Sequence, residues 1–256
     1  MATAVWCVWA TALTVVLLLP VSSMGGGELR MFHQVMVSYA KVSLSQMIYN
    51  GIPPAGANEG AYCSKTCLNL GWCNLWCPNP TAAACTYYNI IVMPTYLETD
   101  NTDAIPCFTK RPRDYVTNAS ITAGQPYDAI MSKENLIDGI YGFNMNECFR
   151  SSQTNIEKWF VLDLGAVTTF TYIRIIAQPN LQAFYHFRKL SLRVGTSPTQ
   201  PYTGFSSYSY FGGFSGPAVG NEEVVLTSGR TVSARYIAGQ MAPQSTTLTV
   251  CHVEVY

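Results

Sequence analysis

The chain has 256 residues, and its 15 Lys and Arg side chains are balanced by 15 Asp and Glu, which gives a formal net charge of zero at pH 7. Electrostatic capture of nucleic acid or of an anionic membrane needs an excess of basic residues. We therefore expect no nucleic acid partner, and we do not expect electrostatic attraction to hold the protein at a membrane. Specific binding to a neutral ligand is open. The length suits one or two domains.

The N-terminus has the pattern of a secretory signal peptide. Residues Met1 to Ser23 contain no charged side chain, and the apolar stretch Val5 to Leu19 is followed by Pro20 and small residues. This pattern is typical of a signal, although the usual basic segment before the apolar stretch is missing. A membrane anchor is the alternative, but the stretch is shorter than the roughly 20 residues that cross a bilayer. We expect cleavage near Ser23 and a secreted, extracellular protein.

Cysteines and a glycosylation sequon agree with that route. Removal of the signal takes away Cys7 and leaves an even set: Cys63, Cys67, Cys73, Cys77, Cys85, Cys107, Cys148 and Cys251. An even number of cysteines in a secreted chain predicts disulfides. Asn118-Ala119-Ser120 is an N-glycosylation sequon that proline does not block, so Asn118 is the candidate for a glycan.

The uneven spacing of the cysteines predicts two units. The first, residues 28–113, is small and cysteine-dense, as expected where the core alone is too small for stability. Within it, Ala61 to Asn69 predicts a short helix and Tyr87 to Val92 a strand. The second unit, residues 114–256, is rich in strands. The basic run from Lys110 to Arg113 at the boundary is either a processing site or, in the simpler interpretation, a solvated linker.

Alternating residues predict strands throughout the second unit. Thr169 to Ile176 predicts a strand with Phe170, Tyr172 and Arg174 on one face and Thr171, Ile173 and Ile175 on the other. Leu190 to Val194 and Thr249 to Val255 alternate in the same way, with His252 and Glu254 opposite the apolar face. The Gly-, Ser- and Tyr-rich run 202–216 is interpreted as a flexible connection, or alternatively as an adhesive loop. The fold class is therefore mainly β, a sandwich or jelly roll.

No catalytic set is visible in the sequence. The histidines, at positions 33, 186 and 252, are scattered, no Gly-x-Ser-x-Gly motif occurs, and every cysteine of the secreted chain can pair. Because nucleophilic catalysis needs a nucleophile, a base and an orienting group together, we do not expect an enzyme.

Several motifs in order resemble the discoidin-like (coagulation factor type C) domains of the galactose-binding fold. They are Asn135 to Gly139, Cys148-Phe149, Trp159 to Gly165, Ala234 to Ile237 and Leu248 to Tyr256. The last two of these fit the fucolectin branch best, and the resemblance covers about 118–256. It implies an eight-stranded jelly-roll β-sandwich whose loops bind a ligand at one end. It also implies a disulfide between Cys148 and Cys251.

The first unit is similar, more weakly, to a PAN/apple module. That similarity implies that Cys63 pairs with Cys85 and Cys67 with Cys73, which leaves Cys77 for Cys107. Sequence alone allows all fifteen pairings of six cysteines. A zinc site is the rival interpretation, but the region from Cys63 to Cys107 has no histidine and the secretory route is oxidising.

The sugar-binding residues of the fucolectins are altered here. That family holds fucose with one histidine and two arginines. Arg150 stands at the histidine position, Gln178 at the first arginine position, and only Arg188 matches, so fucose specificity is not carried over. The run Phe184-Tyr185-His186-Phe187-Arg188 still offers aromatic faces and a forked donor that suit sugars. The alternative is that these aromatics cap the core. The candidate carbohydrate-binding residues are Arg150, Gln178, Phe184, Tyr185, His186 and Arg188.

The resemblance also implies a calcium site near the Asp138-Gly139 turn and the last cysteine. The positions that correspond to it are Asn135, Asp138, Ile140, Glu147, Cys251 and His252. Ile140 could offer only its carbonyl, and His252 replaces a glutamate, which weakens the site because calcium prefers oxygen ligands. Calcium is the one cofactor to test. In the alternative interpretation, Asp138 only shapes the turn.

The sequence thus predicts a secreted, lectin-like protein that binds glycans or glycoproteins, with a role in cell adhesion or innate recognition. The alternative is an extracellular protein–protein interaction module that has lost sugar binding. The oligomeric state is not predicted.

Overall fold

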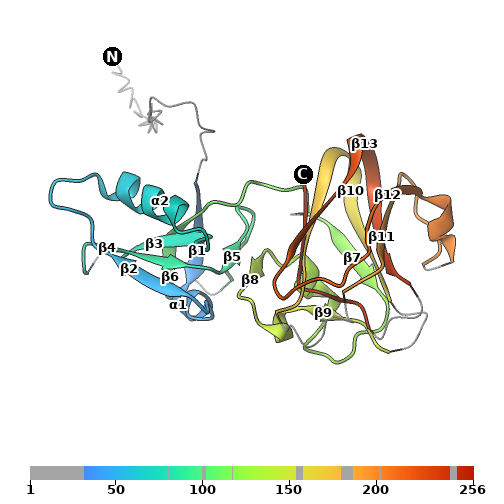
Figure 1. Ribbon diagram of the computed structural model, residues 1–256, viewed down its shortest axis with the longest axis horizontal. Coiled ribbons are helices and arrows are strands. Elements are labelled where there is room, and N and C mark those ends of the chain that lie inside the picture. The colour runs from blue at the N-terminus through green and yellow to red at the C-terminus, as the bar shows by residue number, and fades with distance from the viewer. Residues whose placement is uncertain are drawn as a thin grey trace, which may run out of the picture. The chain divides into compact units, whose positions relative to one another are not determined.

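Strands dominate the computed structural model of the chain (Figure 1). The structure describes residues 32–79, 81–99, 102–116, 118–153, 158–179, 187–201, 203–242 and 247–256. None of the helices in these ranges is both long enough and apolar enough to span a bilayer. The predicted signal peptide, Met1 to Ser23, lies outside the described residues.

The N-terminal part is a five-stranded antiparallel sheet with the order β1-β6-β3-β4-β2. Its strands are β1 (His33–Ser38), β2 (Ile48–Gly51), β3 (Leu75–Asn79), β4 (Ala84–Tyr88) and β6 (Ala104–Thr109). The short helix α1 (Tyr39–Val42) follows β1, and the longer α2 (Glu59–Asn69) precedes β3. Cys63 and Cys67, four residues apart, share the buried face of α2, as residues at that spacing do in a helix.

Two local expectations in this part need adjustment. The predicted helix at 61–69 is present but begins at Glu59, because the Asn58 side chain caps it by accepting a hydrogen bond from the Ala61 N–H. The predicted strand at 87–92 is divided into the end of β4 and a separate β5 (Ile91–Val92). Asn89 interrupts it, since its side-chain oxygen accepts bonds from the Met47 N–H and the Ser45 hydroxyl.

The C-terminal part is built on a six-stranded antiparallel sheet with the order β12-β11-β13-β10-β15, in which β7 also pairs with β10. Apart from β8 (Ile140–Tyr141), the described residues from 118 onward contain eight strands. They are β7 (Ser120–Ala123), β9 (Phe149–Arg150), β10 (Trp159–Ile176), β11 (Leu190–Gly195), β12 (Ser209–Phe214), β13 (Glu223–Met241), β14 (Thr249–Val250) and β15 (His252–Val255). The pair β9–β14 forms a small second sheet. The expected mainly β, jelly-roll sandwich is confirmed.

Short 3-10 helices complete this part: η1 (Lys133–Leu136), η2 (Met145–Glu147) and η4 (Gly204–Ser207). The run 202–216 was expected to be a flexible connection, and this was wrong for most of its length. Residues 209–214 form β12, because Phe211 is buried in the core and the strand pairs with β11. Asn118, the predicted glycosylation site, is exposed in a turn before β7, and its modification stays a prediction.

The long strands β10 and β13 pair over most of their length, and their register shifts at two places. One irregularity lies between Asp163 and Thr168, where Gly165 adopts a left-handed φ of 78°, and the other between Phe170 and Tyr172. The second one corrects the expected faces of this strand. Phe170 joins Ile173 in the core, because a bulge between them shifts the alternation by one residue.

Contacts continue across the predicted unit boundary at 113–114. β5 pairs with β8, and the Met93 N–H donates to the Gly139 carbonyl at 2.8 Å. Arg111, expected in a solvated linker, is only 4% exposed and bonds the Glu223 carboxylate with both terminal amines. Residues 31–256 therefore form one compact unit. The division into two modules, 28–113 and 114–256, stays a prediction.

Candidate functional site

The Cys148–Cys251 disulfide organises the end of the sandwich where the candidate residues lie. Its Cα atoms are 3.8 Å apart although the cysteines are separated by 103 residues. The Cys251 N–H donates to the Ile176 carbonyl, which ties the disulfide to the end of β10. The other disulfides are Cys63–Cys85, Cys67–Cys73 and Cys77–Cys107. These are the four pairs that the family resemblances implied, and such a set is typical of an oxidising compartment.

Arg150 is the candidate sugar ligand with the clearest geometry. It lies on β9, two residues after Cys148, and its backbone is held by the Tyr127 N–H at 2.7 Å and the Met131 carbonyl at 3.2 Å. Its guanidinium carbon lies 4.1 Å from the centroid of the Tyr127 ring, a cation–π contact. Tyr127 is 50% exposed. Among the described residues, no acceptor engages the Arg150 guanidinium, whose Nε is buried without a partner.

Gln178 and Arg188 are held by one loop. The Asn221 N–H donates to the Gln178 carbonyl, and the Ala218 N–H donates to the Phe187 carbonyl just before Arg188. Arg188 is half-buried, whereas Gln178 is only 3% exposed, so its side chain is hardly presented to solvent. Gln178 lies two residues beyond Ile176 and Arg150 two residues beyond Cys148, so the disulfide anchors both. The remaining candidates, Phe184, Tyr185 and His186, lie outside the described residues.

Sequence reasoning missed Tyr127, the aromatic partner of Arg150. The two are 23 positions apart, and the strand that Arg150 occupies is two residues long. Segment 125–127 reaches it through a bridge between Pro126 and Ser151. No local periodicity signals such a contact, so only the folded chain reveals the pair.

The calcium candidates contribute two carboxylates and a set of backbone carbonyls. The Asp138 carboxylate accepts from the Ile140 N–H and shapes the turn in which Gly139 has a φ of 80°. Burial raises the pKa of Asp138 to about 7, and the nearby Glu147 carboxylate adds to the shift. Burial also raises the pKa of Glu147, which accepts from the Gly142 N–H. Because burial disfavours the charged form of both carboxyls, a bound cation would stabilise their ionised forms.

The other candidates around this turn are less favourable. Asn135 donates through Nδ2 to the carbonyls of Ile130, Asn146 and Cys148, so these oxygens already bind an amide. Ile140 is buried in β8, and Cys251 is tied up in its disulfide. Calcium takes six to eight oxygen ligands, so Asp138, Glu147 and some of these carbonyls would have to supply them.

His252 faces a different set of charges. It is 1% exposed, and its Nε2 lies 4.0 Å from a Glu254 carboxylate oxygen. Burial lowers its pKa to about 4, with Glu254 and Arg111 as the nearest charged influences, so the imidazole is neutral at physiological pH. In the described part of the chain, no three His, Cys, Asp or Glu side chains are grouped to hold a metal. Calcium binding stays a prediction that rests on Asp138 and Glu147.

We expect calcium to raise the midpoint of thermal unfolding of EDTA-treated protein at about pH 8, where Asp138 is ionised, because a ligand of the native state stabilises it. The shift should shrink at about pH 5.5, since protonation of Asp138 removes the ligand charge. Differential scanning fluorimetry measures both. Asp138→Asn should abolish the shift, whereas Asp128→Asn, in an exposed neighbouring turn, should keep it. A missing calcium shift at the higher pH would contradict the prediction.

Comparisons with known proteins give a fold-level likeness. No protein family and no curated protein matches the sequence. Among solved structures, the chain is similar to a fucolectin from the serum of striped bass, Morone saxatilis, with 14% identity, a TM-score of 0.46 and coverage of 68% of this chain. The chain spans only 57% of that fucolectin.

Similar structures also include the carbohydrate-binding module CBM32-1 of a family 31 glycoside hydrolase from Clostridium perfringens. Here the identity is 13% and the TM-score 0.43, covering 54% of this chain and 94% of the module. A fucose binding module from Streptococcus pneumoniae has 15% identity and a TM-score of 0.43, covering 56% of this chain and 94% of the module. With TM-scores below 0.5, these similarities carry no weight in the functional argument, which rests on the residues.

Proposed function

We propose that this chain is a secreted, disulfide-bonded protein that binds glycans, free or on glycoproteins, through the end of the sandwich that carries Arg150. The observation that carries the proposal is the Arg150 guanidinium stacked on the half-exposed Tyr127 ring, with its hydrogen-bond donors unclaimed by any described residue. Recognition of cell-surface sugars would place the protein in adhesion or innate recognition.

The chemistry of this pair suits a sugar. A guanidinium presents five N–H donors in a fixed fork, which can span neighbouring hydroxyls of a pyranose ring. An exposed aromatic ring offers an apolar face to the C–H groups of the same sugar. Stacking on Tyr127 also fixes the direction of the Arg150 fork before any ligand arrives, which lowers the entropy cost of binding. Arg188, which is half-buried, is the second cation among the candidate residues.

The test is a glycan array probed with the full-length secreted protein, with and without calcium. We expect binding to at least one glycan, and Arg150→Ala should weaken it by about tenfold or more, equivalent to at least about 1.4 kcal/mol. Tyr127→Phe keeps the ring and should preserve binding, whereas Tyr127→Ala should weaken it. Arg113→Ala is the matched control, since Arg113 is exposed and remote in sequence. An array without any bound glycan, or an unaffected Arg150→Ala variant, would refute the proposal.

The second candidate function is a protein–protein interaction module, and one surface favours it. β2 is an edge strand of the N-terminal sheet, and Ile48, Tyr49 and Ile52 on and beside it are 53%, 50% and 74% exposed. An edge strand with free backbone groups and apolar side chains is a ready template for another chain. An empty glycan array, together with a protein ligand whose binding is lost in Tyr49→Lys, would favour this function.

A further inference from the structure

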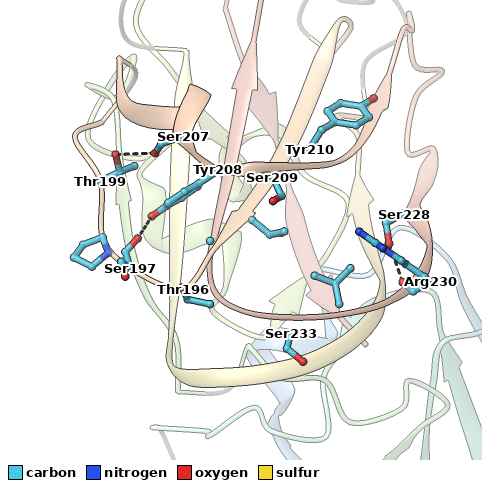
Figure 2. Close-up of a pocket in the computed structure, with 14 residues that line it drawn as sticks. Thr196, Ser197, Thr199, Ser207, Tyr208, Ser209, Tyr210, Ser228, Arg230 and Ser233 are labelled. Atoms are coloured by element: carbon cyan, nitrogen blue, oxygen red, sulfur yellow. Dashed lines mark hydrogen bonds between the residues drawn. The ribbon is translucent and has the colours of Figure 1, made fainter.

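A pocket of about 400 Å³ lies where β11 ends, beside the loop that follows it and the start of β12 (Figure 2). β11 begins two residues after Arg188 and runs to Gly195, so the pocket is at the opposite end of this strand from the proposed sugar site. Nine of its 14 lining residues carry a hydroxyl group, Arg230 is the one charged residue, and the lining contains no acid. Its volume falls in the range of about 300–1,000 Å³ that is usual for small-molecule sites.

One wall of the pocket is fixed by Tyr208. Its ring lies directly against Gly195, where a Cβ would come within 2.4 Å of the ring carbons, so only glycine allows this approach. The Tyr208 hydroxyl donates to the Ser197 carbonyl at 2.8 Å, and Arg193 donates to the Tyr208 carbonyl at 3.0 Å. These bonds hold the loop from Thr196 to Thr199 in place, so the wall is formed before a ligand binds.

The facing wall comes from an outward bulge of β13. Val232 pairs with Phe170 and Thr227 with Tyr172, so residues 228–231 have too few partners on β10 and leave the ladder. Gly229 adopts a φ of 74°, its N–H donates to the Thr227 hydroxyl, and the Ser228 hydroxyl donates to the Arg230 carbonyl. The bulge thereby presents Arg230, whose side chain reaches toward the middle of the pocket (Figure 2).

Arg230 is a cation without a counter-charge. It is exposed, and among the described residues no carboxylate or other acceptor bonds its guanidinium. A guanidinium fork matches a carboxylate with two parallel hydrogen bonds, which makes Arg the usual recognition group for such anions. Across the pocket, the exposed hydroxyls of Thr196, Ser209 and Ser233 can both donate and accept.

We infer that this pocket binds an acidic saccharide unit, a pyranose that carries one carboxylate. The carboxylate pairs with Arg230, and the ring hydroxyls exchange hydrogen bonds with the serine and threonine wall. The single cation and the absence of acids in the lining select one negative charge, while the number of hydroxyls selects a polyhydroxylated ligand rather than a bare anion. This inference goes beyond the Arg150 site and does not rest on it.

The test is a titration of the full-length protein with glucuronate, glucose and inorganic sulfate in parallel, followed by NMR chemical shifts. We expect glucuronate to bind at least about tenfold more tightly than either glucose or sulfate, because only it supplies both the charge and the hydroxyls. Arg230→Gln should weaken glucuronate binding by about tenfold or more. Because Arg230 is exposed, this variant should keep the unfolding midpoint of the parent.

The controls separate this site from the other one. Arg150→Ala should leave the glucuronate-induced shifts of the residues that line the pocket unchanged, and Arg113→Gln controls for the loss of a positive charge elsewhere on the surface. The inference is overturned by an Arg230→Gln variant that binds glucuronate like the parent. It is equally overturned by sulfate binding as tightly as glucuronate, which would mark a simple anion site, or by glucuronate binding that disappears with Arg150→Ala.

Discussion

Replacing Cys148 and Cys251 together by alanine is expected to lower the free energy of unfolding by about 4–5 kcal/mol. The reason is the length of the loop that they close, 103 residues in sequence, because the chain-entropy model of disulfides gives more stabilisation for longer loops. Alanine is preferred to serine, since both cysteines are fully buried and a serine would bury an unpaired hydroxyl. Urea unfolding followed by Trp fluorescence measures the loss.

The short disulfide of the same chain is the internal control. Cys67 and Cys73 are only 6 residues apart, so the same model predicts a smaller loss, about 2 kcal/mol, when both become alanine. A double variant of the short pair that loses as much stability as that of the long pair would contradict the entropic account. We also expect the Cys148/Cys251 variant to bind glycans more weakly, because Arg150 is placed by the strand that directly follows Cys148.

Arg111→Met is expected to cost about 3–5 kcal/mol of unfolding free energy, because it takes one of two cations away from the buried Glu254 carboxylate. The Arg111 side chain is 5% exposed, that of Glu254 is fully buried, and Arg111 Nη1 lies 3.6 Å from a Glu254 oxygen. Arg174, at 2.8 Å from Glu254, can compensate only part of the charge. Chemical denaturation at neutral pH is the measurement.

Two further variants show whether the loss comes from an unpaired charge. Arg111→Met combined with Glu254→Gln should recover part of the stability, since it removes the buried carboxylate charge as well. Arg235→Ala breaks a bidentate pair with Asp163 whose side chains are 38% and 25% exposed. Solvent screens that pair, so we expect a clearly smaller loss than for Arg111→Met. Equal losses for Arg111→Met and Arg235→Ala would contradict the explanation.

Features of the fold that depend on neighbours in sequence were predictable. The helix around Cys63 follows from its four-residue spacing to Cys67, and β11 follows from the alternation of its leucines. The face of Phe170 was not predictable, because a bulge depends on how β13 pairs with β10. Arg111 was misassigned for a similar reason: a basic run looks solvated until Glu223 and Glu254 arrive from far along the chain.

The candidate sites show the same limit. Arg150 and Arg188 could be named because the family resemblance fixed their positions beside strands. The partner of Arg150 and the pocket around Arg230 could not, since each brings together segments that no spacing rule connects. The pocket also uses Tyr208 and Tyr210 from a run whose composition resembles that of a flexible linker. Composition described this run poorly, because its pairing with β11 outweighs its weak local preferences.

The ladder between β5 and β8 joins the N-terminal and C-terminal parts of this chain, so we expect evolution to keep the two parts together. A recombination event that joined a new partner at residue 114 would leave the backbone of Ile140 and Tyr141 without β5 and remove Ile91 and Met93 from the cluster around the buried Tyr141 ring. It would also remove Arg111, one of the two cations beside the buried Glu254 carboxylate. A domain that recombines between genes must pair its own strand edges and buried charges. This sandwich depends on β5 and Arg111 for both, so we expect related proteins to retain the same N-terminal part.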